Sequence, residues 1–372
     1  MNLHLLPDEK IVNRTIEIFE SVFPGKNKYL VFLNGKASKY VDNRHPNICL
    51  TQYGSNDFKK IVGETKQYDK IIIHYLSHYS IKFLNEIEHD NIYWIEWGFD
   101  LFNMLLEPRG YRIYYQDSVL DKFIYRNKIV EFVHKKLRFL FPSKATLAAI
   151  AKIKYFVPDS MYDEYPLLLK YYPQFKHLEY KEFFYYPIQQ VVDNSIYNKR
   201  CYGANIIIGN SASLTGNHLE VLRMLSKIDL GERLVKLPLS YGGSPDYVRF
   251  LADQGTSLLG EHFYSLTSYL SLNEYNNFLL DASYYIYNNY RQEAVGNILV
   301  ALFFGGKVFL SDNSPLLAFY KRLGLVIYAV SDLSKESLNT PMAEEDVLNN
   351  RKIIELHYSL NRLYNLVKLN FS

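Results

Sequence analysis

The stretch NIIIGNSASLTGNHLEVL (205–222) joins a short apolar run to a helical pattern through a loop of small polar residues. The apolar run has the length and the β-branched content of a buried strand, and apolar residues recur at helical spacing after residue 217. A strand, a glycine-containing loop and a helix in this order are typical of a Rossmann-like unit, where the loop lies at the carboxyl edge of a parallel sheet. The stretch therefore predicts an α/β unit with a binding loop that begins at Gly209.

The same alternation of apolar runs and helical patterns extends along the whole chain. Short apolar runs that lack polar alternation are typical of parallel strands buried on both faces. We therefore expect two doubly wound parallel sheets, which form two Rossmann-like domains that face each other across a cleft. The predicted strands are 28–35, 70–77, 91–98 and 154–160 in the first half, and 204–211, 232–242, 256–263, 283–289 and 307–315 in the second.

The length of 372 residues also favours two domains, because it exceeds what a single hydrophobic core usually serves. The segment 185–203 loses periodicity and gains polar and turn residues, as expected for a linker. We place the boundary near Asn198, with an N-terminal domain over 1–198 and a C-terminal domain over 199–342. Apolar positions at helical spacing predict that 343–372 is one long amphipathic helix that packs on or across the domain junction.

The composition narrows the class of protein. Hydrophobic residues make up 48% and charged residues 22%, which is typical of a globular protein, and no 18-residue uncharged apolar run predicts a membrane span. The first residues lack the pattern of a secretory signal, so we expect an intracellular protein. A net charge of +3 does not indicate a nucleic-acid partner. The 34 tyrosines fit either stacking platforms or a biased codon composition.

The cysteines and histidines do not predict a metal site. Cys49 and Cys201 lie far apart and show no metal-ligand spacing, so we expect reduced thiols and no disulfide framework. His74 and His78 follow a predicted strand, but no third ligand follows them at metal spacing.

Three loops of the second half combine glycine with hydroxyl, amide or guanidinium groups. Backbone N–H groups and the positive end of a helix favour anions, and the carboxyl ends of parallel strands meet at one edge of a sheet. We therefore predict that these loops bind a phosphorylated ligand. The candidate residues are Gly209, Asn210, Ser211, Asn217, His218, Tyr241, Gly242, Glu261, Arg291, Gln292, Gly296 and Asn297.

Several of these residues also have an ordinary structural interpretation. Asn217 suits a helix cap, and Glu261 suits a solvated surface as well as a strand end that accepts from a base or ribose. Gly296 lies one turn into a predicted helix, where glycine costs about 1 kcal/mol relative to alanine. Either a ligand or a neighbouring element that approaches closely compensates for that cost.

The stretch WIEWGFDLFN (94–103) mixes aromatic side chains with the carboxylates of Glu96 and Asp100. Aromatic surface next to carboxylates suits a sugar and a general base. A buried tryptophan pair with an aspartate helix cap is the structural alternative.

The segment 121–155 contains nine Lys or Arg residues against two acidic residues, interleaved with apolar side chains. A basic amphipathic face binds an anionic membrane leaflet, with about 1 kcal/mol from each basic residue near the surface. An ordinary helix with a solvated basic face is the alternative.

Five motifs in this order resemble glycosyltransferase family 56, the bacterial 4-acetamido-4,6-dideoxygalactose transferases that extend the enterobacterial common antigen lipid. The resemblance covers most of the chain and is strongest over 205–331. The motifs are NRT (13–15), WGFDL (97–101), GNSASLTGNH (209–218), PLSYG (238–242) and the RQ…G run at Arg291, Gln292 and Gly296. The chain departs from the family in the helix after Gly296 and in the inserted SLTG, which lengthens the first loop.

The resemblance implies a GT-B enzyme that needs no metal or other cofactor, with the acceptor on the N-terminal domain and the nucleotide sugar on the C-terminal one. It implies inverting transfer of an amino-deoxysugar, from a dTDP donor to a polyprenyl-diphosphate-linked saccharide, at the inner face of the cytoplasmic membrane. Asp100 is then the first candidate for the general base and Glu96 the second. The acceptor-binding candidates are Asn13, Arg14, Trp97 and Gly98.

Two other functions remain open for the same architecture. One is an epimerase or hydrolase of nucleotide sugars, which would act without an acceptor lipid. The other is a protein that binds a nucleotide sugar and does not turn it over.

Overall fold

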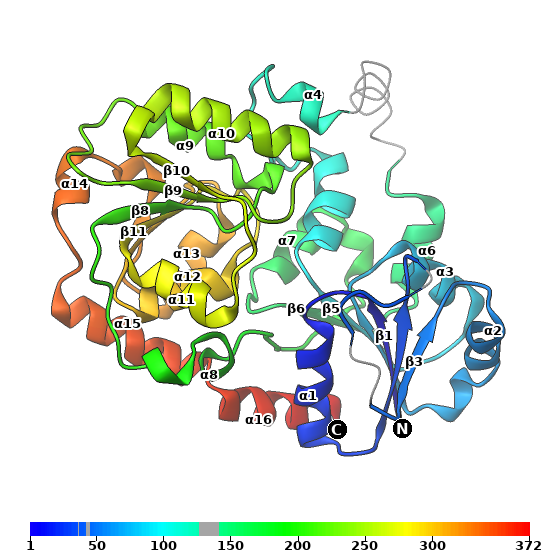
Figure 1. The fold of residues 1–372 in the computed structure, drawn as a ribbon. Helices are drawn as coiled ribbons and strands as arrows, with labels where there is room; N and C mark the ends of the chain where they lie inside the picture. Colours follow the sequence, from blue (N-terminus) through cyan, green and yellow to red (C-terminus); the bar gives the residue numbers. More distant parts are fainter. Residues whose placement is uncertain (36, 42–44, 126–140) are drawn as a thin grey trace. The chain divides into compact units, whose positions relative to one another are not determined.

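The computed structural model describes residues 1–35, 37–41, 45–125 and 141–372, which form two compact units (Figure 1). Each unit contains one parallel sheet. Unit 1 consists of Met1–Tyr111, Leu137–Tyr185 and Asn361–Ser372, and unit 2 consists of Arg112–Lys136 and Tyr186–Leu360.

Unit 1 has a seven-stranded sheet in the order β3-β2-β1-β4-β5-β6-β7, with all described pairings parallel. The strand order reverses between β1 and β4, which is the point where open α/β sheets bind ligands. The strands are β1 (Asn2–Pro7), β2 (Asn27–Phe32), β3 (Ile48–Thr51), β4 (Lys70–His74), β5 (Ile92–Glu96), β6 (Tyr155–Pro158) and β7 (Glu179–Tyr180).

Helices cover both faces of this sheet. Figure 1 shows α1 and α16 on one face, and α2, α3 and α6 on the other. Serine side chains at positions 55, 77 and 143 accept from backbone N–H groups and begin α2, α3 and α6. The helices of unit 1 are α1 (Val12–Val22), α2 (Asn56–Gly63), α3 (His78–Glu86), a π-helical segment (Phe99–Leu106), α6 (Lys144–Ala151), α7 (Glu164–Tyr171) and α16 (Leu360–Phe371).

Unit 2 has a six-stranded sheet in the order β10-β9-β8-β11-β12-β13, again with parallel pairings. Its order reverses between β8 and β11. The strands are β8 (Asn205–Ile208), β9 (Val235–Pro238), β10 (Phe263–Leu266), β11 (Ala282–Tyr287), β12 (Lys307–Leu310) and β13 (Tyr328–Ala329).

In unit 2, α9 and α10 lie side by side on one face of the sheet, and α11, α12 and α13 cover the other (Figure 1). Apolar side chains from β8, β9 and α9, among them Ile206, Leu222 and Leu237, are fully buried in the core between them. The helices are α4 (Asp121–Ile124), α8 (Ile188–Val191), α9 (His218–Leu225), α10 (Pro245–Leu259), α11 (Leu272–Leu280), α12 (Val295–Phe303), α13 (Pro315–Leu323), α14 (Lys335–Asn339) and α15 (Glu344–His357).

The predicted α/β class with two doubly wound parallel sheets is confirmed. The strand predicted over 256–263 is wrong, because α10 begins at a serine cap on Ser244 and continues through Leu259, and the strand starts only at Phe263. Strands β1, β3, β7 and β13 were not expected. Three of these four strands have four residues or fewer, which is too short for periodicity to reveal.

The division between the units differs from the boundary placed near Asn198. It falls between Tyr185 and Tyr186, and the earlier segment Arg112–Lys136 belongs to unit 2. The single terminal helix predicted over 343–372 is wrong, because the helix ends at His357 and a second one starts at Leu360. No helix among the described residues combines the length and the apolar composition needed to cross a bilayer.

The two terminal helices have partners in different units. The Asn350 side chain of α15 bonds to both the N–H and the carbonyl of Val326, at 2.8 and 3.0 Å. Arg362 of α16 forms an ion pair of 2.6 Å with Glu182 in unit 1. These contacts explain why one continuous helix is not formed.

Candidate functional site

In unit 2 the loops after β8 and β11 lie side by side, because these strands are neighbours at the point where the strand order reverses. The Asn217 side chain donates to the carbonyl of Asn288 at 2.9 Å. Asn289 donates in turn to the carbonyl of Thr215 at 3.2 Å. Ligands of open parallel sheets bind at this edge, so the interlocked loops form the candidate site.

Glu293 joins the two loops through a single carboxylate oxygen. Its Oε2 accepts from the Thr215 hydroxyl at 2.5 Å and from the Asn289 amide at 2.8 Å. The same oxygen lies 3.1 Å from Nη2 of Arg291, a side chain that is 8% exposed. The Arg291 charge, expected to neutralise phosphate, is therefore already balanced within the loop.

His218 fills the space inside the loop after β8. A Cβ on Gly209 would lie 2.8 Å from the imidazole Nε2, and one on Gly216 would lie 2.4 Å from its Cε1. The ring is fully buried, and burial lowers the pKa of His218 to about 4. The two glycines make room for the side chain of the following helix, and phosphate binding by this loop stays a prediction.

The loop after β9 packs against the loop after β8. The N–H of Ala212 donates to the carbonyl of Tyr241 at 2.7 Å, and the Asn210 amide donates to the Tyr241 hydroxyl at 3.1 Å. Gly242 has a φ of 88°, and a Cβ there would lie 3.2 Å from Ser211. The structure thus brings these four ligand-binding candidates together.

The first turn of α12 faces the same edge without a side-chain cap. Its N-cap residue is Ala294, which has a left-handed φ of 63° and no side-chain acceptor. The first N–H groups of a helix have no intrahelical partner and carry partial positive charge. Gly296 and Asn297 lie in this turn and are partly exposed, and the preceding Gln292 is buried.

Packing also accounts for Gly296. A Cβ at this position would lie 3.0 Å from the Tyr186 ring. Close approach of a neighbouring side chain is therefore one reason for a glycine inside the helix.

Glu261 lies away from this site. It follows α10 and precedes β10, so it lies at the amino edge of the sheet, where it is exposed. The prediction that it reaches the ligand depended on the strand over 256–263. Because that segment is helical up to Leu259, Glu261 is at the wrong end of the strand.

In unit 1, Asp100 is fully buried and holds the turn after β5. Its two oxygens accept from the N–H groups of Leu76 and Trp97 at 2.8 and 2.9 Å, and from the indole of Trp94 at 2.7 Å. Burial raises the pKa of Asp100, although the N–H donors oppose the shift. This carboxylate therefore joins the turn after β5 to the loop after β4.

Glu96 is also fully buried, at the end of β5. It accepts from the N–H of Gly98, which has a left-handed φ of 83°. Its Oε2 and both carboxyl oxygens of Glu164 on α7 are buried without a hydrogen-bond partner among the described residues. Burial first, and then the neighbouring carboxylates, raise the pKa of both groups well above the usual value.

The residues predicted to bind the acceptor lie in the first turn of α1 and on the loop after β5. Trp97 stacks on Tyr75 with ring centroids 5.6 Å apart. Asn13 donates to the carbonyl of Tyr40 at 2.9 Å, and Arg14 follows it on α1. Strand β4 lies between β1 and β5, so Trp97 and Gly98 follow a strand two places away from the one that precedes Asn13.

Glu9 is an accessible carboxylate that the sequence interpretation missed. It follows β1 directly, next to the reversal of strand order, and it is exposed. Partial burial and the neighbouring Asp8 carboxylate raise the pKa of Glu9. The signal in the sequence was the largely apolar run 3–7, which is followed by two acidic residues.

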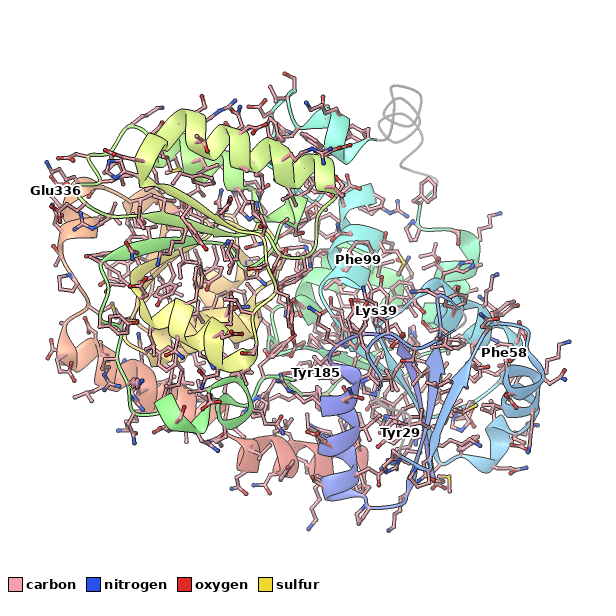
Figure 2. All side chains as sticks on the ribbon, viewed as in Figure 1. Tyr29, Lys39, Phe58, Phe99, Tyr185 and Glu336 are labelled. Atoms are coloured by element: carbon pink, nitrogen blue, oxygen red, sulfur yellow. The ribbon has the colours of Figure 1, made fainter. Side chains whose placement is uncertain are left out.

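Asp8 has a different role from its neighbour. It accepts from the N–H groups of Lys39, Tyr40 and Val41 at 2.6, 3.1 and 3.2 Å and so holds the loop after β2 (Lys39 is labelled in Figure 2). Burial alone would raise the pKa of Asp8, but these bonds outweigh it and hold the pKa below the usual value.

A buried polar chain runs through unit 1 from Asn27 to Tyr185 (labelled in Figure 2). Asn27 Nδ2 donates to the carbonyl of Phe23, so Asn27 Oδ1 accepts from His4 Nε2 at 3.2 Å. His4 Nδ1 then accepts from His74 Nε2 at 2.9 Å, and His74 Nδ1 accepts from the Tyr185 hydroxyl at 2.6 Å. Both histidines are therefore neutral. Among the described residues, no group of three His, Cys, Asp or Glu side chains is placed to hold a metal ion.

The basic segment 121–155 falls largely outside the described residues, which omit 126–140. Its described parts are the short helix α4, residue 125 and the chain from 141 onward, which includes α6. The interpretation as a membrane-binding face stays a prediction.

Comparison with known proteins places the fold in a known class. No family model matches the chain. HepE from Anabaena in complex with UDP-glucose is similar over 100% of this chain and 99% of that one, with a TM-score of 0.65 and 12% identity. A glycosyltransferase from Rickettsia africae has a TM-score of 0.63 and 12% identity over 100% and 97% of the two chains. Sucrose-phosphate synthase from Thermosynechococcus elongatus has a TM-score of 0.60 and 11% identity over 100% and 98%.

At these identities the likeness concerns the fold. The chain has the GT-B fold, with two Rossmann-like units that each contain a parallel sheet. The fold expected from the sequence is therefore confirmed.

Proposed function

We propose that the protein is a glycosyltransferase that moves a sugar from a nucleoside diphosphate to an acceptor hydroxyl. The observation that carries the proposal is the interlocking of the loops after β8 and β11, beside the uncapped first turn of α12, in a GT-B fold. The donor diphosphate then lies at this edge of unit 2. The complexes of the similar HepE with UDP and with UDP-glucose support a donor of this kind.

The edge of unit 2 suits a departing diphosphate. Negative charge grows on the leaving group as the glycosidic bond breaks, and N–H groups that are already oriented stabilise this charge without reorganisation. The first turn of α12 offers such groups, and its positive end adds to the effect. Because no side chain caps this turn, the ligand does not have to displace one.

We further propose that the enzyme is a member of glycosyltransferase family 56 and inverts the anomeric carbon. The order of the motifs at 13–15, 97–101, 209–218, 238–242 and 291–296 supports this assignment. The donor is then a dTDP-linked amino-deoxysugar, and the acceptor is a polyprenyl-diphosphate-linked saccharide. The basic segment 121–155 holds the enzyme at the inner face of the cytoplasmic membrane.

We assign the general base to Glu9. In a single displacement the acceptor oxygen bonds to the anomeric carbon while the bond to the diphosphate breaks, and the base takes the hydroxyl proton. Asp100 and Glu96, the candidates from the sequence, have no exposed surface, and Asp100 already accepts three N–H bonds. Glu9 is exposed at the carboxyl edge of unit 1, and its raised pKa favours proton uptake.

The first experiment measures thermal midpoints with dTDP, UDP and GDP. A ligand that binds only the folded protein raises the midpoint, so the nucleotide that does so identifies the donor class. We expect dTDP to give the largest rise. No rise with any of the three would contradict the proposed function.

The second experiment separates transfer from the other functions. We expect dTDP release from the matching dTDP-sugar to require a polyprenyl-diphosphate saccharide and to yield an extended saccharide. Release without the acceptor and without extension would indicate a hydrolase, and conversion of the sugar an epimerase. Binding without turnover across acceptors would indicate a binding protein.

A further inference from the structure

Residues 112–125 form an arm that belongs to unit 2, although the chain on both sides of Arg112–Lys136 belongs to unit 1. The arm is therefore an insertion, from the first half of the sequence, into the unit that carries the candidate donor site. The arm adds no strand to the sheet of unit 2, whose strands β8 to β13 all come from later residues, so other contacts must hold it there.

Polar contacts fix the arm beside the loop after β8. The N–H of Tyr115 donates to the side-chain oxygen of Asn217 at 2.7 Å. Asn217 is the residue whose amide also bonds to the loop after β11. Asp117 forms an ion pair with Arg223 on α9. The arm, α9 and both loops are thus connected by one set of contacts.

Apolar contacts hold the far end of the arm. Leu120 is 2% exposed and belongs to the core of unit 2. The Phe123 ring lies 5.1 Å from the ring of Tyr247 and 5.0 Å from that of Phe250, both on α10. These polar and apolar contacts together fix the position of the arm on unit 2.

Arg112 lies at the start of the arm, next to the loop after β11. Its guanidinium is 5.2 Å from the centre of the Tyr290 ring, and its Nε donates to the carbonyl of Tyr114 at 3.2 Å. Tyr290 is three residues beyond β11, and its hydroxyl donates to Glu220 at 2.7 Å. Arg112 is itself exposed.

The charges around these loops single out Arg112. Among the described residues, three arginines contact these loops or the arm, namely Arg112, Arg223 and Arg291. Arg223 is paired with Asp117, and Arg291 is paired with Glu293. Within the described part of the chain, no carboxylate pairs with Arg112. It is therefore the arginine of the three whose charge is not balanced by the protein.

We propose that Arg112 binds the diphosphate of the donor, an inference that rests on the proposed function. The guanidinium group is planar, and its N–H groups point outward in that plane. Contact of the guanidinium with an aromatic face therefore does not use these donors. Two parallel N–H groups match two phosphate oxygens. The arm thus supplies a cation that the later part of the sequence does not.

Calorimetry with two kinds of ligand tests this inference. The ligands are UDP and dTDP, which carry the diphosphate, and uridine and thymidine, which do not. For Arg112→Met, which keeps the apolar stem over Tyr290, we expect affinity for the diphosphate that binds wild type to fall about tenfold or more. Affinity for the matching nucleoside is expected to stay the same.

Two further variants complete the design. Arg112→Lys keeps the charge without the planar fork, and we expect an affinity between those of wild type and Arg112→Met. Arg249→Met removes an exposed arginine on α10 that pairs with Asp246, and no change is expected. Thermal midpoints without ligand should be alike in all four proteins.

The outcomes separate the inference from the proposed function. If wild type binds none of UDP, dTDP and the GDP of the first experiment, the proposed function fails and the inference with it. If wild type binds one of them and Arg112→Met binds it equally well, only the inference is overturned. Equal loss of diphosphate and nucleoside affinity also overturns it, because Arg112 would then act on the shape of the loops. Equal affinities of the Lys and Met variants would contradict a role for the charge.

Discussion

The guanidinium of Arg291 and the carboxylate of Glu293 lie 3.1 Å apart, with 9% and 15% of the two side chains exposed. The pair joins the loop after β11 to Thr215 in the loop after β8 through the shared Glu293 oxygen. The Glu293 carboxylate is fixed by its hydrogen bonds to Thr215 and Asn289 as well as by the charge of Arg291. It keeps the two loops in register and leaves the helix end of α12 to face a ligand.

Glu293→Gln should destabilise the protein. Glutamine keeps an oxygen for Thr215 and Asn289, but the Arg291 charge is left buried without compensation, at a cost of about 3 kcal/mol. Urea unfolding measures the change. The matched control is Glu232→Gln, because Glu232 is exposed in the same unit. A loss no larger than that of the control would show that the ion pair does not hold the loops.

Gly216→Ala should cost about 1 to 3 kcal/mol in unfolding free energy, because the new methyl group would lie 2.4 Å from His218. The double variant Gly216→Ala with His218→Ala should lose less unfolding free energy than the sum of the two single variants, because removal of the His218 ring also removes the clash. Gly63→Ala is the control, with no atom within 4 Å of the added Cβ. Strict additivity in the double variant would refute the packing of His218 against this glycine.

Asp100→Asn should weaken the fold of unit 1. The side-chain nitrogen of asparagine cannot accept, so at least one of the three N–H donors loses its partner, at about 1 to 3 kcal/mol each. Chemical unfolding of the variant and of wild type measures the change. If stability is unchanged while turnover falls about a hundredfold, Asp100 acts on the acceptor as first expected from the sequence.

Glu9→Gln should lower turnover about a hundredfold or more while stability and dTDP affinity stay the same, as for the loss of a general base. In wild type, turnover should fall as the pH drops through the raised pKa of Glu9, because the protonated carboxyl group cannot take a proton. Initial rates against pH measure both effects. Lys10→Gln, next in the chain, serves as the control, and normal turnover of the Glu9 variant would exclude it as the base.

Stability should fall with pH below about 6.5 through the pair His4 and His74. Burial lowers the pKa of His4 to about 3 and the pKa of His74 well below its usual value, so the unfolded chain binds protons that the folded one does not. The sign follows from linkage. The contribution of the two histidines to stability is fully present above their pKa in the unfolded chain, about 6.5, and it is lost as the pH falls from 6.5 toward 3. Each histidine contributes about 1.4 kcal/mol per pH unit in this window.

The measurement compares urea unfolding of wild type and His74→Gln at several pH values. The variant should be less stable at pH 7 but should lose less stability on acidification. His78→Gln, at an exposed site, should follow the wild-type slope. Parallel curves for wild type and His74→Gln would mean that the buried histidine does not set the pH dependence.

Most of the sheet framework was predictable because buried parallel strands leave continuous apolar runs. The runs at 70–77, 91–98 and 204–211 each became a strand within the predicted range. The run 256–263 failed because Leu258 and Leu259 also satisfy the helical spacing that starts at Ser244. An apolar run of this length does not distinguish a strand from the end of a helix.

The candidate site was predictable only in part. The convergence of Asn210, Tyr241 and Asn289 follows from strand order, since carboxyl ends share an edge. The filling of the first loop by His218 was not visible in the sequence, because it depends on the direction of one side chain. The arm was missed because its anchors pack against later parts of the chain: Leu120 lies in the core of unit 2, and the Phe123 ring lies against that of Tyr247.

The sequence by itself determined the class of fold, because the spacing of apolar residues along the chain dictates which segments are strands and helices. It also determined which loops carry glycine and polar groups at the strand ends. Only the tertiary structure decided which charges remain available there. Burial depends on contacts between distant segments, so the tertiary structure encloses Asp100 and Glu96 and leaves Arg112 and Glu9 exposed. The pairing of Arg291 with Glu293, two residues further on, depends on how the loop after β11 folds.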